Sequence, residues 1–146
     1  MTVEIRPMRP EDAVEIRRQA SQRVQMGLSR DMTLAEAAEL VDEGAALTAF
    51  VGARIVACFG IRETFPGAQG VAWALLAEGL GGAHLAVTRA ARRLVMRSPL
   101  ARIEAIVRAD VDAEVIWARL VGLTAAHVLR KFGAASEDHI LFERIR

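Results

Sequence analysis

Apolar and polar residues alternate at the start of the chain and then recur at helical spacing. The segment from Val3 to Pro7 alternates and meets a proline, which is typical of a short strand. A helix is expected from Pro10, because proline is tolerated in a first helical turn and acidic residues follow it. We expect this helix to end near Gly27. Its apolar stripe consists of Ala13, Ile16, Ala20 and Val24.

The next part of the chain predicts a capped helix and a hairpin. Thr33 is followed three residues later by Glu36, which is the spacing of a capping box, and this helix is expected to end at Gly44. Residues 46–51 and 54–62 are strand-like, and the Gly-Ala pair between them predicts a tight turn. The inward-facing positions expected in the helix are Leu34, Ala37, Ala38 and Val41.

A continuous apolar run over residues 71–77 (VAWALLA) predicts a central strand that is covered on both faces. A glycine-rich stretch follows it. Next comes a helix with one buried side, which ends where Ser98 precedes Pro99. The buried positions expected in this helix are Val87, Ala91, Leu94 and Val95.

The remainder of the chain predicts a strand, a helix and a closing hairpin. Residues 102–108 alternate as a strand, and residues 113–121 have helical spacing. Residues 127–132 and 139–145 read as two strands joined by a turn. The order β-α-α-β-β-β-α-β-α-β-β predicts one α/β domain over residues 1–146. We expect a mixed central sheet of about seven strands with helices on both faces.

Composition and charge exclude several classes of protein. The 146 residues are 53% hydrophobic and 25% charged, which is typical of a folded globular chain. No apolar run approaches the ~18 residues of a membrane span, and the N-terminus lacks the apolar core of a secretory signal. The single cysteine, Cys58, fits a reducing, cytoplasmic compartment and a packing role in its apolar surroundings. A net charge of +1 argues against nucleic acid as a partner.

The element order, with the residues at its joints, resembles the GCN5-related N-acetyltransferase (GNAT) superfamily. The opening IRPMRPEDA is similar to the usual start of such chains. VRADVDAEVIWARLVGL is similar to the family's fifth strand and its helix, which ends in Leu-Gly-Phe and here ends in Val121-Gly122-Leu123. HVLRKFGAASEDHILFERI is similar to the closing hairpin. The resemblance covers essentially the whole chain and implies acyl transfer from acetyl-CoA to a small-molecule or peptide amine.

Four shorter segments are similar to a narrower group of GNAT-like proteins from phages and prophages, related to the internal virion protein A of short-tailed phages. These segments are GVAWALL, AVTRAARR, RIEAIV and WARLVGL. This resemblance implies a non-enzymatic virion or assembly protein that retains the acetyltransferase fold. Its partners would be phage virion proteins, and its location would be the virion. A homodimer, in which the partner is a second copy of the chain, is a further alternative.

GNAT enzymes bind acetyl-CoA through an Arg/Gln-x-x-Gly-x-Gly/Ala loop, where small residues let backbone amides and a helix N-terminus approach the pyrophosphate. The best match here starts at Glu78, where the family has Arg or Gln. A carboxylate at ~4 Å opposes a phosphate by about 1 kcal/mol in water. The alternative is a tight turn that kept its glycines for geometry alone. The implied cofactor-binding residues in this loop are Gly79, Gly81, Gly82 and Ala83.

The resemblance also implies that the fourth and fifth strands part. The pantetheine arm and the thioester carbonyl would lie between Leu75, Leu76 and Ala77 on one strand and Ala105 to Val107 on the other. Coordinates in which the two strands pair along their full length would contradict this expectation.

Many GNAT enzymes protonate the departing thiolate with a tyrosine four residues before the glycine of Leu-Gly-Phe. That position is Ala118 here, and the chain contains no tyrosine. Trp117 fits a core aromatic, and the family's Asn position is Val111. Loss of a general acid typically costs about 10²–10⁴-fold, although water can supply the proton.

A general base would have to deprotonate the attacking amine. Glu63, at the end of the third strand, is nearest the usual acceptor cleft in this interpretation. The alternative is that Glu63 has only a structural role, as a turn residue. Glu104, His127 and His139 are further candidates, with an exposed strand or hairpin position as the alternative. His84 fits a first helical turn. No His, Cys and Asp cluster has metal-ligand spacing, so no metal is expected.

Arg89, Arg93 and Arg97 recur every four residues and share one helix face, with Arg92 beside them. That face could meet the 3′-phosphate of CoA, a nucleic acid or an acidic partner. A solvated surface with cations near a helix C-terminus is the interpretation we favour.

Overall fold

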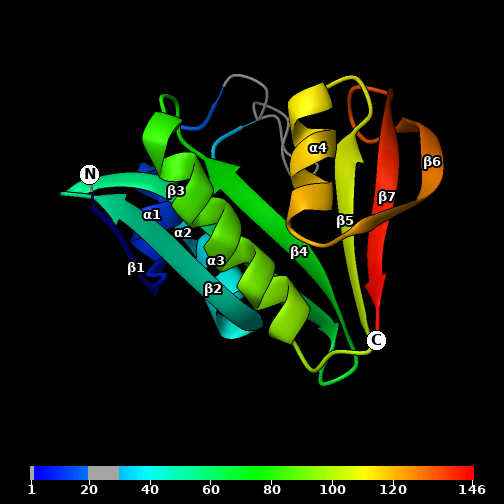
Figure 1. Cartoon of the computed structure of the whole chain (residues 1–146), viewed down its shortest axis with the longest axis horizontal. Helices are drawn as coiled ribbons and strands as arrows, with labels where there is room; N and C mark the ends of the chain where they lie inside the picture. The colour runs from blue at the N-terminus through cyan, green and yellow to red at the C-terminus, as the bar shows by residue number, and fades with distance from the viewer. Residues whose placement is uncertain (1, 20–29) are drawn as a thin grey trace.

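The computed structural model describes residues 2–19 and 30–146, and it confirms the expected order of elements (Figure 1). The strands are β1 (Val3–Pro7), β2 (Gly44–Val51), β3 (Arg54–Phe65), β4 (Gln69–Leu76), β5 (Arg102–Arg108), β6 (Thr124–Phe132) and β7 (Glu137–Ile145). The helices are α1 (Pro10–Glu15), α2 (Leu34–Asp42), α3 (His84–Arg97) and α4 (Asp112–Leu120), and a short 3-10 turn, η2 (Gly81–Ala83), precedes α3.

The seven strands form one mixed sheet in the order β1-β2-β3-β4-β5-β7-β6. Every neighbouring pair is antiparallel except β4 and β5, which are parallel. The predicted hairpin is confirmed: Val51 lies opposite Arg54, and Gly52 takes a φ of +60° in the turn between them. A parallel pair requires a crossover, and α3 provides it.

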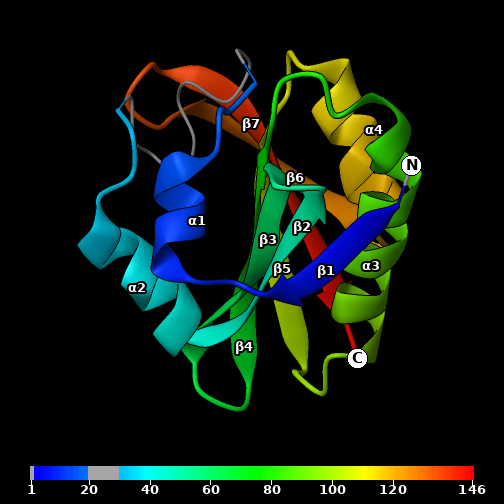
Figure 2. The same ribbon diagram turned by 90° about the vertical axis from the view of Figure 1, so that its left-hand side faces the viewer.

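The helices cover both faces of the sheet (Figure 2). Successive strand residues face opposite sides, so β4 contributes to two separate cores. Trp73, Leu75 and Ala77 pack with α1 and α2, while Ala74 and Leu76 pack with α3 and α4. In α3, Val87, Ala91 and Val95 are buried as expected, and Leu94 is half-buried.

The first helix is shorter than its apolar stripe predicted. Pro10 occupies the first turn and Asp12 accepts a hydrogen bond from the amide of Arg9, as expected of a helix start, but the helix ends at Glu15. Ile16 is already extended, with ψ of 132°. The stripe residues Ala20 and Val24 and the expected stop at Gly27 lie outside the described residues. Residues 17–19 instead pair with the end of β4, so tertiary pairing overrides the helical pattern here.

The capping box of α2 is confirmed in both directions. The amide of Glu36 donates to Oγ1 of Thr33 at 3.2 Å, and the amide of Thr33 donates to Oε2 of Glu36 at 3.0 Å. The expected inward face was partly wrong, because Leu34 is 53% exposed while Leu40 is buried at 1%. In the described part of the chain, no helix is long and apolar enough to cross a bilayer.

Candidate functional site

The strands β4 and β5 pair only where they begin. Gln69, Gly70 and Val71 lie opposite Arg102, Ile103 and Glu104, and the ladder stops there. Beyond that point β4 continues to pair with β3, and β5 continues to pair with β7. The two strands therefore spread apart in the middle of the sheet, as Figure 1 shows. The expected parting is present.

A cavity of about 280 Å³ lies on the α3 and α4 side of this parting. Its walls are largely apolar and come from both strands and both helices. Among them are Leu76 of β4, Ala105 of β5, Leu94 of α3 and Trp117 of α4. We call this cavity the donor cleft. Its volume is just below the ~300–1,000 Å³ typical of ligand pockets.

A larger cavity of about 1220 Å³ lies toward the ends of β3 and β5 and the turn between β6 and β7. We call it the acceptor cavity. Among the described residues, its lining contains five carboxylates against two guanidiniums and one imidazole. The carboxylates are Asp42, Glu43, Glu63, Glu114 and Glu137, and the other charged or titratable groups are Arg62, Arg108 and His139.

Both guanidiniums of the acceptor cavity are bound to carboxylates. Arg62 pairs with Glu39 at 3.3 Å and with Glu43 at 2.5 Å. Arg108 pairs with Asp110 at 2.9 Å and with Glu137 at 2.8 Å. The hydrogen bond from Arg108 lowers the pKa of Asp110 below its usual value. The acceptor cavity therefore carries an excess of negative charge.

The donor cleft and the acceptor cavity meet at four residues that line both. They are Ala72, Trp73, Ile106 and Glu114. Three of the four lie on the parted strands, and the fourth lies in the first turn of α4. The two cavities therefore share part of their lining at the parting of β4 and β5. Within residues 2–19 and 30–146, Glu114 is the one carboxylate of this junction.

The glycine stretch forms a tight turn between the end of β4 and α3, and His84, which follows it, lines the donor cleft. Gly79 and Gly81 take φ values of +64° and +45°, which favour glycine, and η2 then leads into α3. The side chain of Glu78 is exposed, and its carbonyl accepts a hydrogen bond from the guanidinium of Arg54. This arginine lies beside Gly79, where an added Cβ would be 3.3 Å from its Nη2. The guanidinium of Arg54, which belongs to β3, therefore places a positive charge next to the loop.

The residues expected to hold the pantetheine arm are buried at the end of β4. Leu75 is fully buried on the α1 and α2 side, and Leu76 lines the donor cleft. The Ala77 amide donates to the carbonyl of Val56 in β3 at 3.0 Å. On the other edge of the strand, the carbonyl of Leu76 accepts from the amide of Gln19 at 2.8 Å.

The positions that correspond to the family's Asn and Tyr both line the donor cleft. They are Val111 and Ala118, and neither carries a titratable group. The Trp117 indole donates to Oγ1 of Thr88 at 2.8 Å, and that oxygen lies 3.3 Å from Nδ1 of His84. Trp117 thus links α4 to α3, and His84 begins α3 as expected.

The candidate bases divide into residues near the acceptor cavity and residues away from it. Glu63 lines the cavity, and its Oε1 accepts the amide of Gly67 at 2.7 Å, so it also acts as a turn residue. Glu104 accepts from Arg102 at 2.6 Å and lines neither cavity. His127 is exposed on β6, while His139 lines the acceptor cavity and packs edge-on against Phe132.

Cys58 is fully buried, and burial raises its pKa to about 12. Its thiol therefore stays protonated, which agrees with a packing role. Across residues 2–19 and 30–146, no group of three His, Cys, Asp or Glu side chains is arranged to hold a metal ion.

Three residues of the site escaped the sequence analysis: Glu114, Gln19 and Arg54. Glu114 had a usable signal, since it lies four residues before Ala118 and so shares its helix face. Gln19 and Arg54 had none, because they reach the site from distant elements. Gln19 lines the donor cleft from the segment after α1.

Comparison with known proteins gives matches only at the level of structure. No protein-family model and no curated protein matches the sequence. Ard1 from Thermoplasma volcanium is 17% identical with a TM-score of 0.75, covering 99% of this chain and 98% of its own. A GNAT-family acetyltransferase from Streptococcus pneumoniae is 17% identical with a TM-score of 0.68, covering 99% of each chain.

A third solved structure is the spermidine N-acetyltransferase of Vibrio cholerae in complex with CoA and spermine. It is 12% identical with a TM-score of 0.71, covering 98% of this chain and 95% of its own. These identities are low, so the likeness concerns the backbone arrangement. Together with the parted fourth and fifth strands, it shows that this chain has the GNAT acetyltransferase fold.

Proposed function

We propose that this protein is an N-acetyltransferase that transfers an acetyl group from acetyl-CoA to a cationic amine. The observation that carries the proposal is the meeting of the donor cleft and the acceptor cavity at Ala72, Trp73, Ile106 and Glu114. Acyl transfer needs the thioester and the amine within reach of each other, and positioning alone can supply a large part of the rate. A structural neighbour that binds CoA and spermine gives the same pairing of ligands on this fold.

The donor cleft fits the pantetheine arm in its chemistry. Its walls are largely apolar, which suits the mostly hydrocarbon chain of the pantetheine arm. We assign the arm to Leu75, Leu76 and Ala77, and the pyrophosphate to the loop of Gly79, Gly81, Gly82 and Ala83. Arg54 lies beside this loop and supplies the positive charge that Glu78 does not.

The acceptor cavity fits an amine that carries positive charge. Five carboxylates line it, and its two guanidiniums are already bound to carboxylates. A polyamine or a basic peptide would be attracted, whereas an anionic amino compound would be repelled. The substrate class we propose is therefore a diamine, a polyamine or a basic peptide.

Acetyl-CoA would supply an activated thioester. The reacting nitrogen, in its neutral form, would bond to the carbonyl carbon and lose a proton, while the carbon–sulfur bond breaks and the thiolate takes a proton from water. The chain must accept the proton that the amine loses. We assign this role to Glu114, because it is the one carboxylate in the described part of the chain that lines both cavities. Glu63 is the second candidate, since it lines only the acceptor cavity and holds the amide of Gly67.

Binding and turnover of acetyl-CoA test the proposal directly. Acetyl-CoA at 100 times its dissociation constant should raise the free energy of unfolding by about 2.7 kcal/mol, which thermal unfolding detects. Release of CoA, followed with a thiol reagent, should depend on an added diamine and should not occur with glutamate in its place. No thermal shift at millimolar acetyl-CoA would contradict the proposal.

The base is tested by comparing two isosteric variants. Glu114→Gln should lower kcat/KM by about 10²–10⁴-fold, whereas Glu63→Gln should have a smaller effect. The pH dependence of kcat/KM separates a base from a positioning residue, because loss of the base removes its limb of the profile. A larger loss in Glu63→Gln would reverse the assignment.

A second candidate function is favoured by Ala118 and by the exposed Glu78, which replace the family's acid and its phosphate-binding residue. It is a non-enzymatic virion or assembly protein of a phage or prophage that keeps the fold. This candidate predicts no binding of acetyl-CoA, and co-purification with phage virion proteins would support it.

A further inference from the structure

Residues 17–19 pair with the edge of β4 that faces β5, beyond the point where β4 and β5 stop pairing. Ala77 pairs with β3 through the carbonyl of Val56, so its neighbours Leu76 and Glu78 point their backbone groups to the opposite edge. There the amide of Gln19 donates to the carbonyl of Leu76 at 2.8 Å, and the amide of Glu78 donates to the carbonyl of Arg17 at 3.0 Å.

Two further contacts of this segment strengthen the pairing. Arg18 forms an antiparallel bridge with Ala77, and the side-chain amide of Gln19 donates to the carbonyl of Ala77 at 3.2 Å. The segment therefore makes an isolated antiparallel bridge at the far end of the parting. Gln19 also lines the donor cleft, so the chain itself bounds the cleft at that end.

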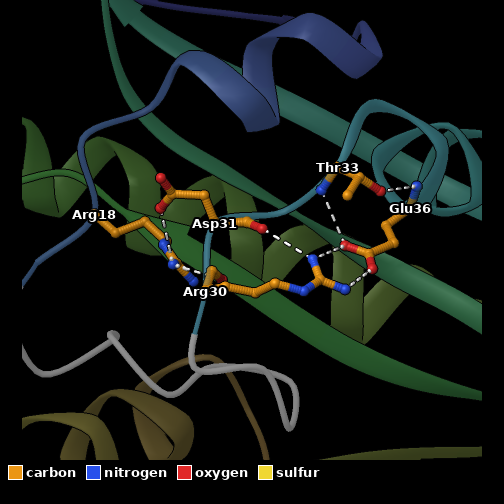
Figure 3. Close-up of polar contacts among 5 residues, drawn as sticks. All are labelled: Arg18, Arg30, Asp31, Thr33 and Glu36. Carbon is orange, nitrogen blue, oxygen red and sulfur yellow. Dashed lines mark hydrogen bonds and ion pairs between the residues drawn. The ribbon is translucent and has the colours of Figure 1, made fainter.

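Side-chain contacts hold the segment from its other side, as Figure 3 shows. The guanidinium of Arg18 donates to the carbonyl of Arg30 at 3.1 Å and to Oδ1 of Asp31 at 3.3 Å. Arg30 in turn pairs with Glu36 at 2.6 Å, and Glu36 belongs to the capping box of α2. The segment after α1 is thus tied to the start of α2 while it pairs with β4.

We propose that Arg17–Gln19 sets the affinity of the donor cleft by competing with the acyl donor for the edge of β4. This inference rests on the proposed function. An extended arm that adds to β4 as a strand would use the backbone groups of Leu76 and Glu78, which the segment already binds. The arm can bind there only after the segment leaves, so the two are mutually exclusive.

Mutual exclusion has a measurable consequence. A donor that must displace the segment loses the free energy of the hydrogen bonds that it breaks. One backbone hydrogen bond of ordinary net strength corresponds to about 5-fold in affinity. Weakening the segment should therefore tighten the binding of CoA, in contrast to the usual effect of damaging a binding site.

The test compares the CoA dissociation constants of the unaltered protein and four variants by isothermal titration. Gln19→Pro removes the amide that binds Leu76 and should tighten binding about 5-fold or more. Gln19→Ala keeps that amide, loses only the side-chain bond to Ala77, and should have a smaller effect. Arg18→Ala releases the contacts with residues 30 and 31 and should also tighten binding.

Arg30→Ala is the matched control, because it removes a guanidinium of the same network yet keeps the carbonyl that Arg18 uses. It should change the affinity for CoA much less than Arg18→Ala does. Equal dissociation constants in all five proteins would overturn the inference and leave the proposed function standing. Absence of binding in all five would overturn both.

Hydrogen exchange on the unaltered protein tests the same point without a substitution. The amides of Gln19 and Glu78 should be protected in the protein alone, and that of Gln19 should lose protection when CoA is added. Protection of Gln19 that persists at saturating CoA would overturn the inference even if a variant failed to fold.

Discussion

The indole nitrogen of Trp117 donates a hydrogen bond to Oγ1 of Thr88 over 2.8 Å, which joins α4 to α3. Trp117 also lines the donor cleft. We expect the two residues to be coupled in stability. Trp117→Phe and Thr88→Val should each lower the free energy of unfolding, and the double-mutant cycle in urea should give a coupling of about 0.5–1.5 kcal/mol. A coupling near zero would show that the bond contributes nothing to the docking of α4.

Ala118 offers a way to add the acid that the chain lacks. Its side chain is 4% exposed and lines the donor cleft, so Ala118→Tyr should cost about 1–3 kcal/mol of stability through overpacking. If the phenol reaches the departing thiol, kcat for CoA release should rise about 10²-fold. Ala118→Phe is the control, since it adds the ring without the hydroxyl. An equal kcat in the two variants would argue against acid catalysis from this position.

The ion pair of Arg30 and Glu36 predicts a pH dependence of stability. The hydrogen bond from Arg30 lowers the pKa of Glu36 to about 2, below its ordinary value of 4.5. A lowered pKa in the folded state stabilises the fold above the unfolded-state value, and the contribution disappears as the pH falls to the folded value. The difference in unfolding free energy between the wild type and Glu36→Gln should therefore be constant above about pH 5 and shrink toward pH 2.

Urea titrations at fixed pH values and low salt measure that difference, because urea adds no ionic strength. Because the pair is exposed, added salt should reduce it as well. A difference that stays constant from pH 6 to pH 2 would show that the ion pair does not contribute, leaving only the uncharged part of the capping box.

Gly60 shows where the sheet has no room for a side chain. A Cβ at this position would lie 2.2 Å from the carbonyl oxygen of Ala45 and 2.9 Å from the Trp73 ring. Gly60→Ala should therefore destabilise the fold by about 3 kcal/mol, which lowers Tm by roughly 6–12 °C. Gly67→Ala is a useful comparison, because Gly67 has a φ of +74° with nothing near its added Cβ, and it should cost only about 1 kcal/mol. Equal Tm values for the two variants would contradict the steric argument.

Much of this fold could be predicted because its signals are local. The alternation of Arg102–Arg108, the apolar run of β4 and the Thr33 to Glu36 spacing each report on a few neighbouring residues, and all were confirmed. The parting of β4 and β5 was also expected, but from resemblance rather than from any property of the two strands. Leu34 was misassigned because its helical spacing does not say which side of a short helix meets the sheet.

The site was only partly predictable for the same reason. The glycines of the loop predict a turn from the local sequence alone. The sequence also shows directly that Ala118 cannot act as an acid. By contrast, nothing near Gln19 indicates that it will pair with Leu76, and nothing near Arg54 indicates that it will bind the carbonyl of Glu78. Contacts of this kind depend on chain segments that only folding brings together.

The amino-acid sequence alone thus determined the order and type of the elements, the turn glycines and the absence of a tyrosine, since period, composition and residue identity belong to the chain itself. Tertiary structure decided where α1 ends, which carboxylate lies at the junction of the two cavities, and which segment occupies the edge of β4. Those outcomes depend on backbone and side-chain groups that are far apart in the chain. In the unfolded chain each of these groups contacts water, and folding replaces that water with the partner group.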